Sequence, residues 1–356
     1  MRPPSDGALR GAIVGFGLAG SAFHVPLIAS TPGLAVSAIV TANPQRVASA
    51  RENYPDARVL ADVDELFSAA SEFDFVVVAT PNHAHAPIAL RTLDAGLPVV
   101  VDKPLAPTAA EARVLVERAE ERDVLLTVFL NRRWDSDLLT LKRLIAENTL
   151  GKVLRFESRF ERWRPQLAAG AWREETPVTE GGGLLLDLGT HLVDQATLLF
   201  GPVTRVYAEI QRLRGAASDD DVFVALRHAS GTLSHLWASA LAAAPGPRLR
   251  VLGDRAAYVI AELDGQETAL RSGVLPGDGA AWGAEPPERW GRLFADGREE
   301  PVESEPGAWP SFYVALEQAL REGGPPPVDP ADGVAVLEIL EMAQRSAASG
   351  EVQGVR

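Results

Sequence analysis

Short apolar runs alternate with amphipathic stretches from residue 9 to about residue 130. The apolar, β-branched runs are residues 34–40, 75–79, 99–101 and 124–128, and the stretches with helical spacing are 65–70, 86–93 and 109–122. This alternation is typical of βαβ units, and nearly continuous apolar strands indicate a parallel sheet that is buried on both faces. We therefore expect an α/β Rossmann domain with a doubly wound parallel sheet over residues 1–130.

The pattern changes after residue 130. One helical stretch is followed by β-rich runs at residues 153–163, 203–213, 222–227, 232–239, 248–252 and 257–261. The connections between these runs are too short to hold crossover helices, so the sheet should be mainly antiparallel. We expect residues 131–356 to form an α+β domain. Its large sheet should be open on one face, and its last helix is expected to pack back on the Rossmann domain.

Composition narrows the class of protein. The chain has 356 residues, of which 46% are hydrophobic, and this is enough for two domains with full cores. A net charge of -14 argues against nucleic acid or an anionic membrane as the main partner. The absence of cysteine excludes disulfides, thiol nucleophiles and Cys-ligated zinc. The first ten residues contain prolines and charges rather than an apolar signal core, so a cytoplasmic protein is expected.

A glycine-rich loop follows the first apolar run. Gly15, Gly17 and Gly20 have Gly-x-Gly-x-x-Gly spacing, with Leu18 and Ala19 between the last two. In a dinucleotide site the first glycine permits a sharp turn, the second lets the backbone approach a pyrophosphate, and the third lets helix and strand pack closely. The spacing also occurs in purely structural turns, but the βαβ context makes it a dinucleotide fingerprint.

The end of the second predicted strand bears on the choice of cofactor. NAD sites usually place an acid there to bind the ribose hydroxyls, yet residues 29–51 contain neither Asp nor Glu. Thr41, Asn43 and Arg46 instead offer a hydroxyl, an amide and a guanidinium that can hold a 2′-phosphate. We therefore expect NADP(H) to be preferred over NAD(H). In the alternative interpretation Arg46 is a solvated helix residue.

Two loops after later strands carry candidate chemistry, because ligands of open α/β sheets bind at the carboxyl ends of strands. In the first loop Thr80 and Pro81 end a strand, and Asn82 and His85 either face the nicotinamide or cap the next helix.

The second loop is Asp102-Lys103-Pro104. The chain has only three lysines among 34 basic residues, so a lysine in this loop suggests a chemical role that arginine could not fill. An ammonium can polarise a hydroxyl or carbonyl and can change its pKa in a closed site.

A helix is predicted over residues 183–200. Asp187, His191 and Asp194 are spaced i, i+4, i+7 and share one face. His191 can exchange a proton near neutral pH, with a carboxylate to orient it. The alternative is an Asp-His pair that stabilises a surface. Gly189 lies mid-helix, where it is unfavourable, so a close approach to the backbone is expected. No metal site is expected, because the six histidines are scattered and no His-Glu-x-x-His is present.

Taken in order, these motifs resemble the Gfo/Idh/MocA oxidoreductase family. The matching residues are the glycine loop with His24 and Pro26, Thr80-Pro81-Asn82 with His85, Asp102-Lys103-Pro104, and Asp187 to His191 with Asp194. The segments 129–144, 162–165, 171–174 and 246–248 are similar to the branch that contains NADP-dependent scyllo-inositol dehydrogenases. The family often has Glu before the Lys-Pro pair, where this chain has Asp102. That branch tends to place an Arg directly after the second strand, whereas here only the later Arg46 is available.

The resemblance implies a mechanism. His191, oriented by Asp187, would take the hydroxyl proton of a cyclic polyol or sugar as hydride passes to the nicotinamide, and Lys103 would hold the reacting oxygen. Four residues are candidates for polyol recognition, or alternatively for packing: Asn131, Arg132, Trp163 and Trp172. The resemblance also implies that residues 131–356 bind the substrate and mediate oligomerisation, with a homodimer or homotetramer formed through the second sheet.

Two further functions stay open at this level. The fold also serves non-catalytic, dinucleotide-dependent sugar sensors, although such a protein does not need Lys103, Asp187 and His191 together. An NAD-dependent glycosidase would use a transient hydride transfer without net reduction of the cofactor. An aldehyde or imine reductase with the same fold is a further alternative, and it is closer to the main interpretation. The identity of the substrate depends on a three-dimensional pocket.

Overall fold

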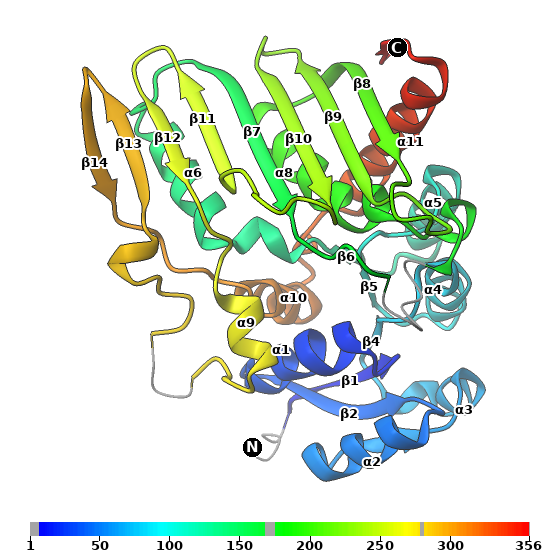
Figure 1. Cartoon of the computed structure of the whole chain (residues 1–356). Helices are drawn as coiled ribbons and strands as arrows, with labels where there is room; N and C mark the ends of the chain where they lie inside the picture. Colours follow the sequence, from blue (N-terminus) through cyan, green and yellow to red (C-terminus); the bar gives the residue numbers. More distant parts are fainter. Residues whose placement is uncertain (1–6, 168–174, 278–280, 356) are drawn as a thin grey trace. The chain divides into compact units, whose positions relative to one another are not determined.

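A computed structural model describes residues 7–167, 175–277 and 281–355 of the chain (Figure 1). The chain divides into two compact units. Unit 1 comprises residues 1–131, 266–281 and 309–334, and unit 2 comprises residues 132–265, 282–308 and 335–356.

Unit 1 contains a six-stranded, all-parallel sheet. Its strand order is β3-β2-β1-β4-β5-β6, so the order reverses between β1 and β4. The strands are β1 (Leu9–Val14), β2 (Leu34–Val40), β3 (Arg58–Leu60), β4 (Phe75–Val78), β5 (Val99–Asp102) and β6 (Leu126–Phe129). The helices are α1 (Val25–Ser30), α2 (Pro44–Asn53), α3 (Val63–Ser68), α4 (His85–Asp94) and α5 (Ala109–Arg122). This confirms the predicted doubly wound Rossmann sheet.

Three neighbouring strands of this sheet are buried along their whole length, as their apolar sequences predict. Every residue of β4, β5 and β6 is buried, because helices cover both faces of a doubly wound sheet. The strand ends are therefore the part of the sheet that a ligand can reach.

Two later segments complete unit 1. They carry α9 (Gln266–Arg271) and α10 (Pro310–Glu322). Trp309 is almost fully buried against the edge of Phe23, with the ring centroids 5.7 Å apart, and Phe312 contacts Phe129 edge to face at 4.9 Å. Aromatic contacts of this geometry stabilise beyond their buried area. Residues near position 310 thus belong to the core of the dinucleotide-type unit.

Unit 2 is built on a nine-stranded sheet of order β14-β13-β12-β11-β7-β10-β9-β8-β15. All neighbours are antiparallel except β7 and β10, which are parallel. The strands are β7 (Val153–Glu161), β8 (Val203–Gln211), β9 (Asp221–His228), β10 (Leu233–Ser239), β11 (Leu249–Gly253), β12 (Ala257–Ile260), β13 (Gly291–Ala295), β14 (Arg298–Val302) and β15 (Gln353–Gly354). The helices are α6 (Ser136–Ala146), α8 (Thr190–Phe200) and α11 (Pro330–Ser349), the last of which begins in unit 1.

The two faces of this sheet differ. Figure 1 shows α6 and α8 on the same side of the strands. Residues that face these helices are apolar and buried, among them Phe156 and Phe160 of β7 and Val224 of β9. The opposite face carries the half-buried Phe223 and Trp237, with the Arg159 guanidinium 3.9 Å above the Trp237 ring. The predicted α+β unit with a mainly antiparallel sheet is confirmed.

The sequence analysis missed the hairpin of β13 and β14. Most of its residues are exposed, so its strands lack the apolar runs that identified the others. The sequence does contain one signal of this hairpin, the Asp296-Gly297 pair between Ala295 and Arg298. In the structure both residues have positive φ values, of 50° and 72°. An Asp-Gly pair of this kind is the preferred two-residue hairpin turn.

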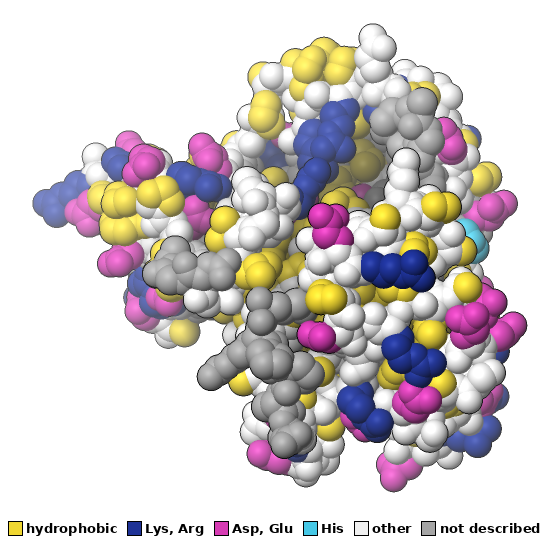
Figure 2. Space-filling model, turned by 90° about the horizontal axis from the view of Figure 1, so that it is seen from below, with side chains coloured by type: hydrophobic (Ala, Val, Ile, Leu, Met, Phe, Trp, Pro, Cys, Tyr) yellow, Lys and Arg dark blue, Asp and Glu magenta, His cyan; other side chains and the backbone are white. Residues whose placement is uncertain are grey.

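Surface charge is mixed rather than segregated on the face drawn in Figure 2, where acidic and basic side chains lie close to one another. Surface ion pairs such as Arg58 with Glu72 and Arg91 with Asp64 belong to this pattern. In the described part of the chain, no helix is long and apolar enough to cross a membrane. The same residues contain no cluster of three or more His, Asp or Glu that could hold a metal ion.

Candidate active site

The glycine loop joins β1 to a π-helical turn, Gly20–His24, that leads into α1. Gly15 has φ +100°, and a Cβ there would lie 2.5 Å from the carbonyl oxygen of Ala79. A Cβ at Gly20 would lie 2.0 Å from the carbonyl oxygen of Gly15. Both glycines are therefore required by the fold itself.

Gly17 differs from its two neighbours. The nearest atoms to a Cβ there are the guanidinium nitrogens of Arg46, at 3.9 and 4.0 Å. Nothing in the fold requires glycine at this position, whereas a pyrophosphate approaching the backbone would. Leu18, next to it, is 48% exposed, and Ala19 precedes the π-helical turn. The loop thus has the open backbone that a dinucleotide needs.

The residues after β2 lie near the same loop. Thr41 is buried, and the Asn43 side-chain oxygen accepts the Gln45 and Arg46 N–H groups at 3.1 Å each, which caps α2. The cap fixes the first turn of α2, from which Arg46 reaches Gly17. The structure thus brings two of the predicted cofactor residues together, and Asn43 supports them as a helix cap.

The loop after β4 lies beside the glycine loop, at the point where the strand order reverses. Ligands of open α/β sheets bind at such a point. The Thr80 hydroxyl is buried and has no hydrogen-bond partner among the described residues. A buried hydroxyl of this kind is costly unless something else bonds to it, so it fits a site for a polar ligand. Pro81 is exposed and Asn82 is buried.

His85 joins this loop to the one after β5. Its imidazole is fully buried, with Nδ1 2.8 Å from the Pro104 carbonyl oxygen and Nε2 3.0 Å from the Thr80 carbonyl oxygen. Burial lowers the pKa of His85, although the nearby Asp102 opposes this effect. A neutral imidazole has one N–H, so it donates to one of the two carbonyls. His85 therefore links the two strand-end loops, and α4 begins without a side-chain cap.

The Asp102-Lys103-Pro104 segment begins at the carboxyl end of β5. The Asp102 Oδ1 accepts the Lys103 N–H at 2.9 Å, and the Lys103–Pro104 peptide bond is cis. Burial acts to raise the pKa of Asp102, but the facing imidazole of His24 and the charge of Lys103 outweigh burial and hold it below its usual value. Asp102 is therefore an ionised, buried carboxylate next to Lys103.

The predicted proton-transfer pair lies in unit 2. Asp187 lies in a π-helical turn, Leu185–Gly189, and His191 lies in the first turn of α8, where it is buried. A Cβ at Gly189 would come within 3.2 Å of Leu340 of α11, so the expected close approach is made by this helix. Asp194, on the same face, accepts Arg133 through both carboxylate oxygens at 3.0 and 3.1 Å. Both carboxylate oxygens of Asp194 are thus paired with Arg133.

The predicted polyol-binding residues are spread over different environments. Asn131 and Arg132 are both buried, and Arg132 Nη1 lies 3.2 Å from Asp135 Oδ2, with its guanidinium 4.9 Å from the Phe160 ring. Trp163 is 57% exposed next to Leu241. Trp172 lies outside the described residues.

Sequence reasoning gave no structural role to a buried ionic network around Arg248. Its guanidinium is 2% exposed and contacts Asp137 at 2.8 Å, Gln195 Oε1 at 2.8 Å and Ser158 Oγ at 2.5 Å. Gln195 in turn donates to the Arg132 carbonyl at 3.1 Å. A charged residue within the apolar run 248–252 was the available signal. The network joins α6, α8, β7 and the residue that precedes β11 in unit 2.

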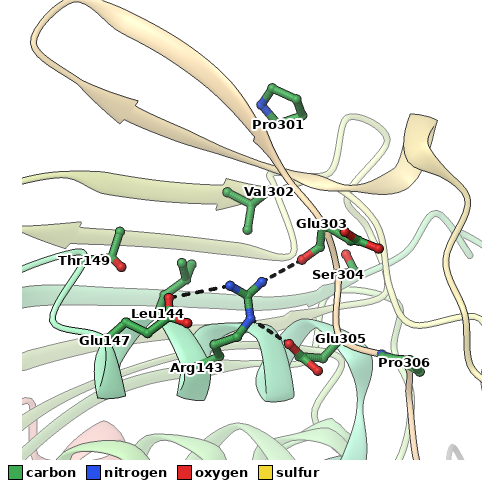
Figure 3. A pocket seen from close by; sticks show the side chains of 10 residues that line it. All are labelled: Arg143, Leu144, Glu147, Thr149, Pro301, Val302, Glu303, Ser304, Glu305 and Pro306. Atoms are coloured by element: carbon green, nitrogen blue, oxygen red, sulfur yellow. Dashed lines mark hydrogen bonds and ion pairs between the residues drawn. The ribbon is translucent and has the colours of Figure 1, made fainter.

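One pocket of about 570 Å³ lies elsewhere in unit 2 (Figure 3). It is formed by the end of α6 and the segment that follows β14. Arg143 donates to the Glu303 carbonyl at 2.8 Å and pairs with Glu305 at 2.6 Å and Glu147 at 3.6 Å. Since the pocket wall itself neutralises this cation, the pocket is part of the scaffold.

Comparisons with known proteins agree with this geometry. Residues 9–130 match the model described as oxidoreductase family, NAD-binding Rossmann fold, and residues 138–259 match the GFO/IDH/MocA C-terminal domain. The chain belongs to the Gfo/Idh/MocA oxidoreductase family. It is an NAD(P)-binding oxidoreductase, and the predicted resemblance is confirmed.

Individual members of the family align over nearly the whole chain. The oxidoreductase YdgJ of Escherichia coli is 38% identical over 95% of this chain and 96% of its own length. The scyllo-inositol 2-dehydrogenase (NADP(+)) IolW of Bacillus subtilis is 34% identical over 95% of this chain and 93% of its own. A solved structure of the oxidoreductase yvaA from Bacillus subtilis has a TM-score of 0.90 at 32% identity, covering 98% of this chain and 100% of that one.

Proposed function

We propose that this oxidoreductase is an NADP-preferring dehydrogenase of a cyclic polyol or sugar, of the inositol type. The observation that carries the cofactor preference is the position of Arg46, within 4.0 Å of a Cβ at Gly17, together with the absence of Asp and Glu from residues 29–51. A guanidinium suits a 2′-phosphate, whereas a carboxylate at this point would suit the free ribose hydroxyls. The similarity to an enzyme named for NADP(+) and scyllo-inositol supports the same choice.

The residues of unit 1 bind and orient the dinucleotide. Gly17 leaves room for the pyrophosphate, the N-terminal turn that follows offers its N–H groups, and Arg46 neutralises the 2′-phosphate. The Thr80 hydroxyl offers a hydrogen bond at the strand ends. When bound, the nicotinamide accepts hydride from the carbinol carbon, or returns it in reduction.

Three residues act on the substrate in this proposal. Lys103 donates to the reacting oxygen and stabilises the negative charge that develops on it. His191 takes the hydroxyl proton on a ring nitrogen, or returns it in the reverse direction, and Asp187 orients the ring. Recognition of the polyol is assigned to Asn131, Arg132, Trp163 and Trp172.

The cofactor proposal is tested by absorbance at the reduced-nicotinamide band with NADP and NAD supplied separately and a panel of inositols, hexoses and pentoses. NADP should give the higher kcat/KM, and Arg46→Ala should raise KM for NADP by about tenfold while leaving NAD nearly unaffected. Arg51→Ala, an exposed arginine in the last turn of the same helix, is the matched control and should change neither. A variant that weakens both cofactors equally would contradict the assignment of Arg46.

The catalytic roles are tested in the same assay. Lys103→Met and His191→Asn should each lower kcat by about a hundredfold or more, with the Kd for NADP nearly unchanged. Unchanged turnover would refute the role of that residue. No signal with any polyol, despite tight dinucleotide binding, would favour a sensor. Release of sugar from a glycoside without net reduction would favour the glycosidase.

We also propose that the uncovered face of the nine-stranded sheet joins copies of the chain into a dimer or tetramer. Phe223, Trp237 and Arg159 present a partly exposed aromatic and cationic surface there. Light scattering of the wild type should report an oligomer, and Trp237→Glu should shift it towards the monomer, since it places a charge in an apolar interface. A wild type that is monomeric at micromolar concentration would contradict this proposal.

A further inference from the structure

A chain of buried polar side chains runs through unit 1 to the backbone of Lys103. It begins at Tyr313 of α10, whose hydroxyl lies 2.5 Å from Nδ1 of His24. Nε2 of the same imidazole lies 3.7 Å from Asp102 Oδ1, and that oxygen accepts the Lys103 N–H at 2.9 Å. Tyr313 and His24 are fully buried and Asp102 is 9% exposed. Residues 289 positions apart are thereby connected to the loop that carries the predicted oxygen-binding lysine.

Packing fixes the imidazole in place. The Phe129 ring lies against His24 with the ring centroids 4.3 Å apart, and Tyr313 contacts the same Phe129 at 5.9 Å. Phe312 closes the cluster through edge-to-face contacts with both Phe129 and Tyr313. Because close-packed aromatic rings resist reorientation, the two nitrogens of His24 have fixed directions.

The partners of these nitrogens determine where the proton of a neutral imidazole sits. A neutral imidazole has one N–H donor and one bare acceptor nitrogen. If Tyr313 donates to Nδ1, the N–H is on Nε2 and points at the Asp102 carboxylate. If Nδ1 carried the proton, a bare nitrogen would face a buried carboxylate, which is repulsive. The carboxylate therefore favours the Nε2–H form, and in this form the Tyr313 hydroxyl donates to Nδ1.

From this geometry we infer that Tyr313 and His24 are positioning residues that act through Asp102 on Lys103. The phenol bonds to Nδ1 and holds the imidazole so that Nε2–H faces the Asp102 carboxylate, and the carboxylate anchors the Lys103 main chain and balances its ammonium charge. This inference rests on the proposed function only in assigning the reacting oxygen to Lys103.

Two arguments show why this row of buried side chains would matter for turnover. Nε2 of His24 makes no hydrogen bond within the described residues, and Asp102 Oδ1 lies 3.7 Å away, so a small shift would close the gap. A misplacement of about 1 Å at a reacting group can reduce the rate as much as a hundredfold. The row of side chains Tyr313, His24 and Asp102 thus couples the packing of α10 to the position of Lys103.

The test is the variant Tyr313→Phe, which removes the hydroxyl and keeps the ring. With NADP and scyllo-inositol as the probes, kcat should fall by about tenfold, while KM for NADP stays within about twofold. Tyr258→Phe is the matched control, a buried tyrosine of unit 2 whose hydroxyl has no hydrogen-bond partner among the described residues, and kcat should not change in it. Unchanged kcat in Tyr313→Phe would overturn the inference.

A second measurement does not depend on turnover. In protein labelled with ¹⁵N-histidine, long-range ¹⁵N–¹H correlation spectra distinguish the two tautomers, and His24 is assigned among the six histidines with His24→Gln. We expect the Nε2–H form in the wild type and, in Tyr313→Phe, a change in the Nδ1 chemical shift, because the variant removes the hydroxyl that donates to this nitrogen. The Nδ1–H form in the wild type, or an unchanged Nδ1 shift in the variant, would overturn the inference. If the wild type oxidises no polyol but shows the expected tautomer and the expected shift change, the proposed function fails and the positioning role of Tyr313 and His24 stands.

Discussion

The two units bury polar and charged side chains in different ways. In unit 1 several buried groups near the site bond to the backbone, as His85 does with two carbonyl oxygens and Asp102 with the Lys103 N–H. In unit 2 buried ion pairs are present, and Arg248 and Arg132 face the carboxylates of Asp137 and Asp135. A buried group that bonds to backbone keeps its partner when a neighbouring side chain is replaced, whereas a buried ion pair loses its partner when either member is replaced.

The charge pattern of unit 2 has a further consequence. Burial and the nearby carboxylates of Asp264 and Asp137 raise the pKa of Asp135 well above its usual value. The guanidinium groups of Arg132 and Arg248 act in the opposite direction, because each favours the ionised carboxylate. Buried charges of this kind are tolerated only when each has a partner of opposite sign.

The largest expected effect comes from removing one member of this network. Arg248→Ala leaves the buried Asp137 without its cation and should lower the free energy of unfolding by about 3–5 kcal/mol. Arg250→Ala, two residues away in β11, removes a half-exposed partner of Glu157 and should cost about 1 kcal/mol or less. Urea unfolding followed by fluorescence measures both. Equal losses in the two variants would show that the buried network has no special role.

Asp219 makes the stability of unit 2 depend on pH. Its Oδ2 accepts the Leu185 N–H at 2.6 Å at the start of the helical segment that carries His191. Burial raises its pKa to about 6, while the backbone N–H groups that bond to it act in the opposite direction. Because the native pKa exceeds the unfolded one, the native state binds more protons between pH 4 and 6. The contribution of this group to stability therefore decreases as pH rises through that window.

The neutral variant Asp219→Asn tests this directly. Its stability relative to wild type should increase by about 3 kcal/mol between pH 4 and pH 7, as judged from the size of the pKa shift. Urea midpoints at several pH values provide the measurement. Parallel pH profiles for the two proteins would show that Asp219 ionises normally in the native state.

Two substitutions in the glycine loop of unit 1 distinguish a glycine that the fold requires from one that the ligand requires. Gly20→Ala places a Cβ against the Gly15 carbonyl and should destabilise the protein by about 1–3 kcal/mol. Gly17→Ala meets only the end of Arg46, so stability should change by less than about 0.5 kcal/mol while the Kd for NADP rises by about tenfold. Thermal unfolding and fluorescence titration separate the two effects. A Gly17→Ala variant with unchanged affinity would refute the pyrophosphate role.

The smallest effect is expected at Tyr258 in unit 2. Its buried hydroxyl has no hydrogen-bond partner among the described residues, and burial raises its pKa. Tyr258→Phe removes an unsatisfied polar group, so the stability should stay the same or increase by up to about 1 kcal/mol. A loss of more than that in urea unfolding would reveal a bond that holds the hydroxyl.

Much of unit 1 was predictable because its signals are local. The apolar runs, the glycine spacing and the breaks after β4 and β5 each lie within a few consecutive residues, and a parallel sheet necessarily brings its strand ends to one edge. Unit 2 was predictable in class but less so in detail. The exposed β13–β14 hairpin carried only a turn signal, and the pairing of Asp194 with Arg133 could not be read from the helical spacing that drew attention to Asp194.

The sequence by itself determined the architecture of the dinucleotide unit, the class of sheet in the second unit and the family, because periodicity and glycine spacing act through neighbouring residues. Only the tertiary structure decided which polar groups meet. Tyr313 reaches His24 across 289 positions, Arg46 reaches Gly17, and Arg248 reaches Gln195 and Asp137. Side chains so distant along the chain are brought together by packing, which the pattern of a single segment does not encode.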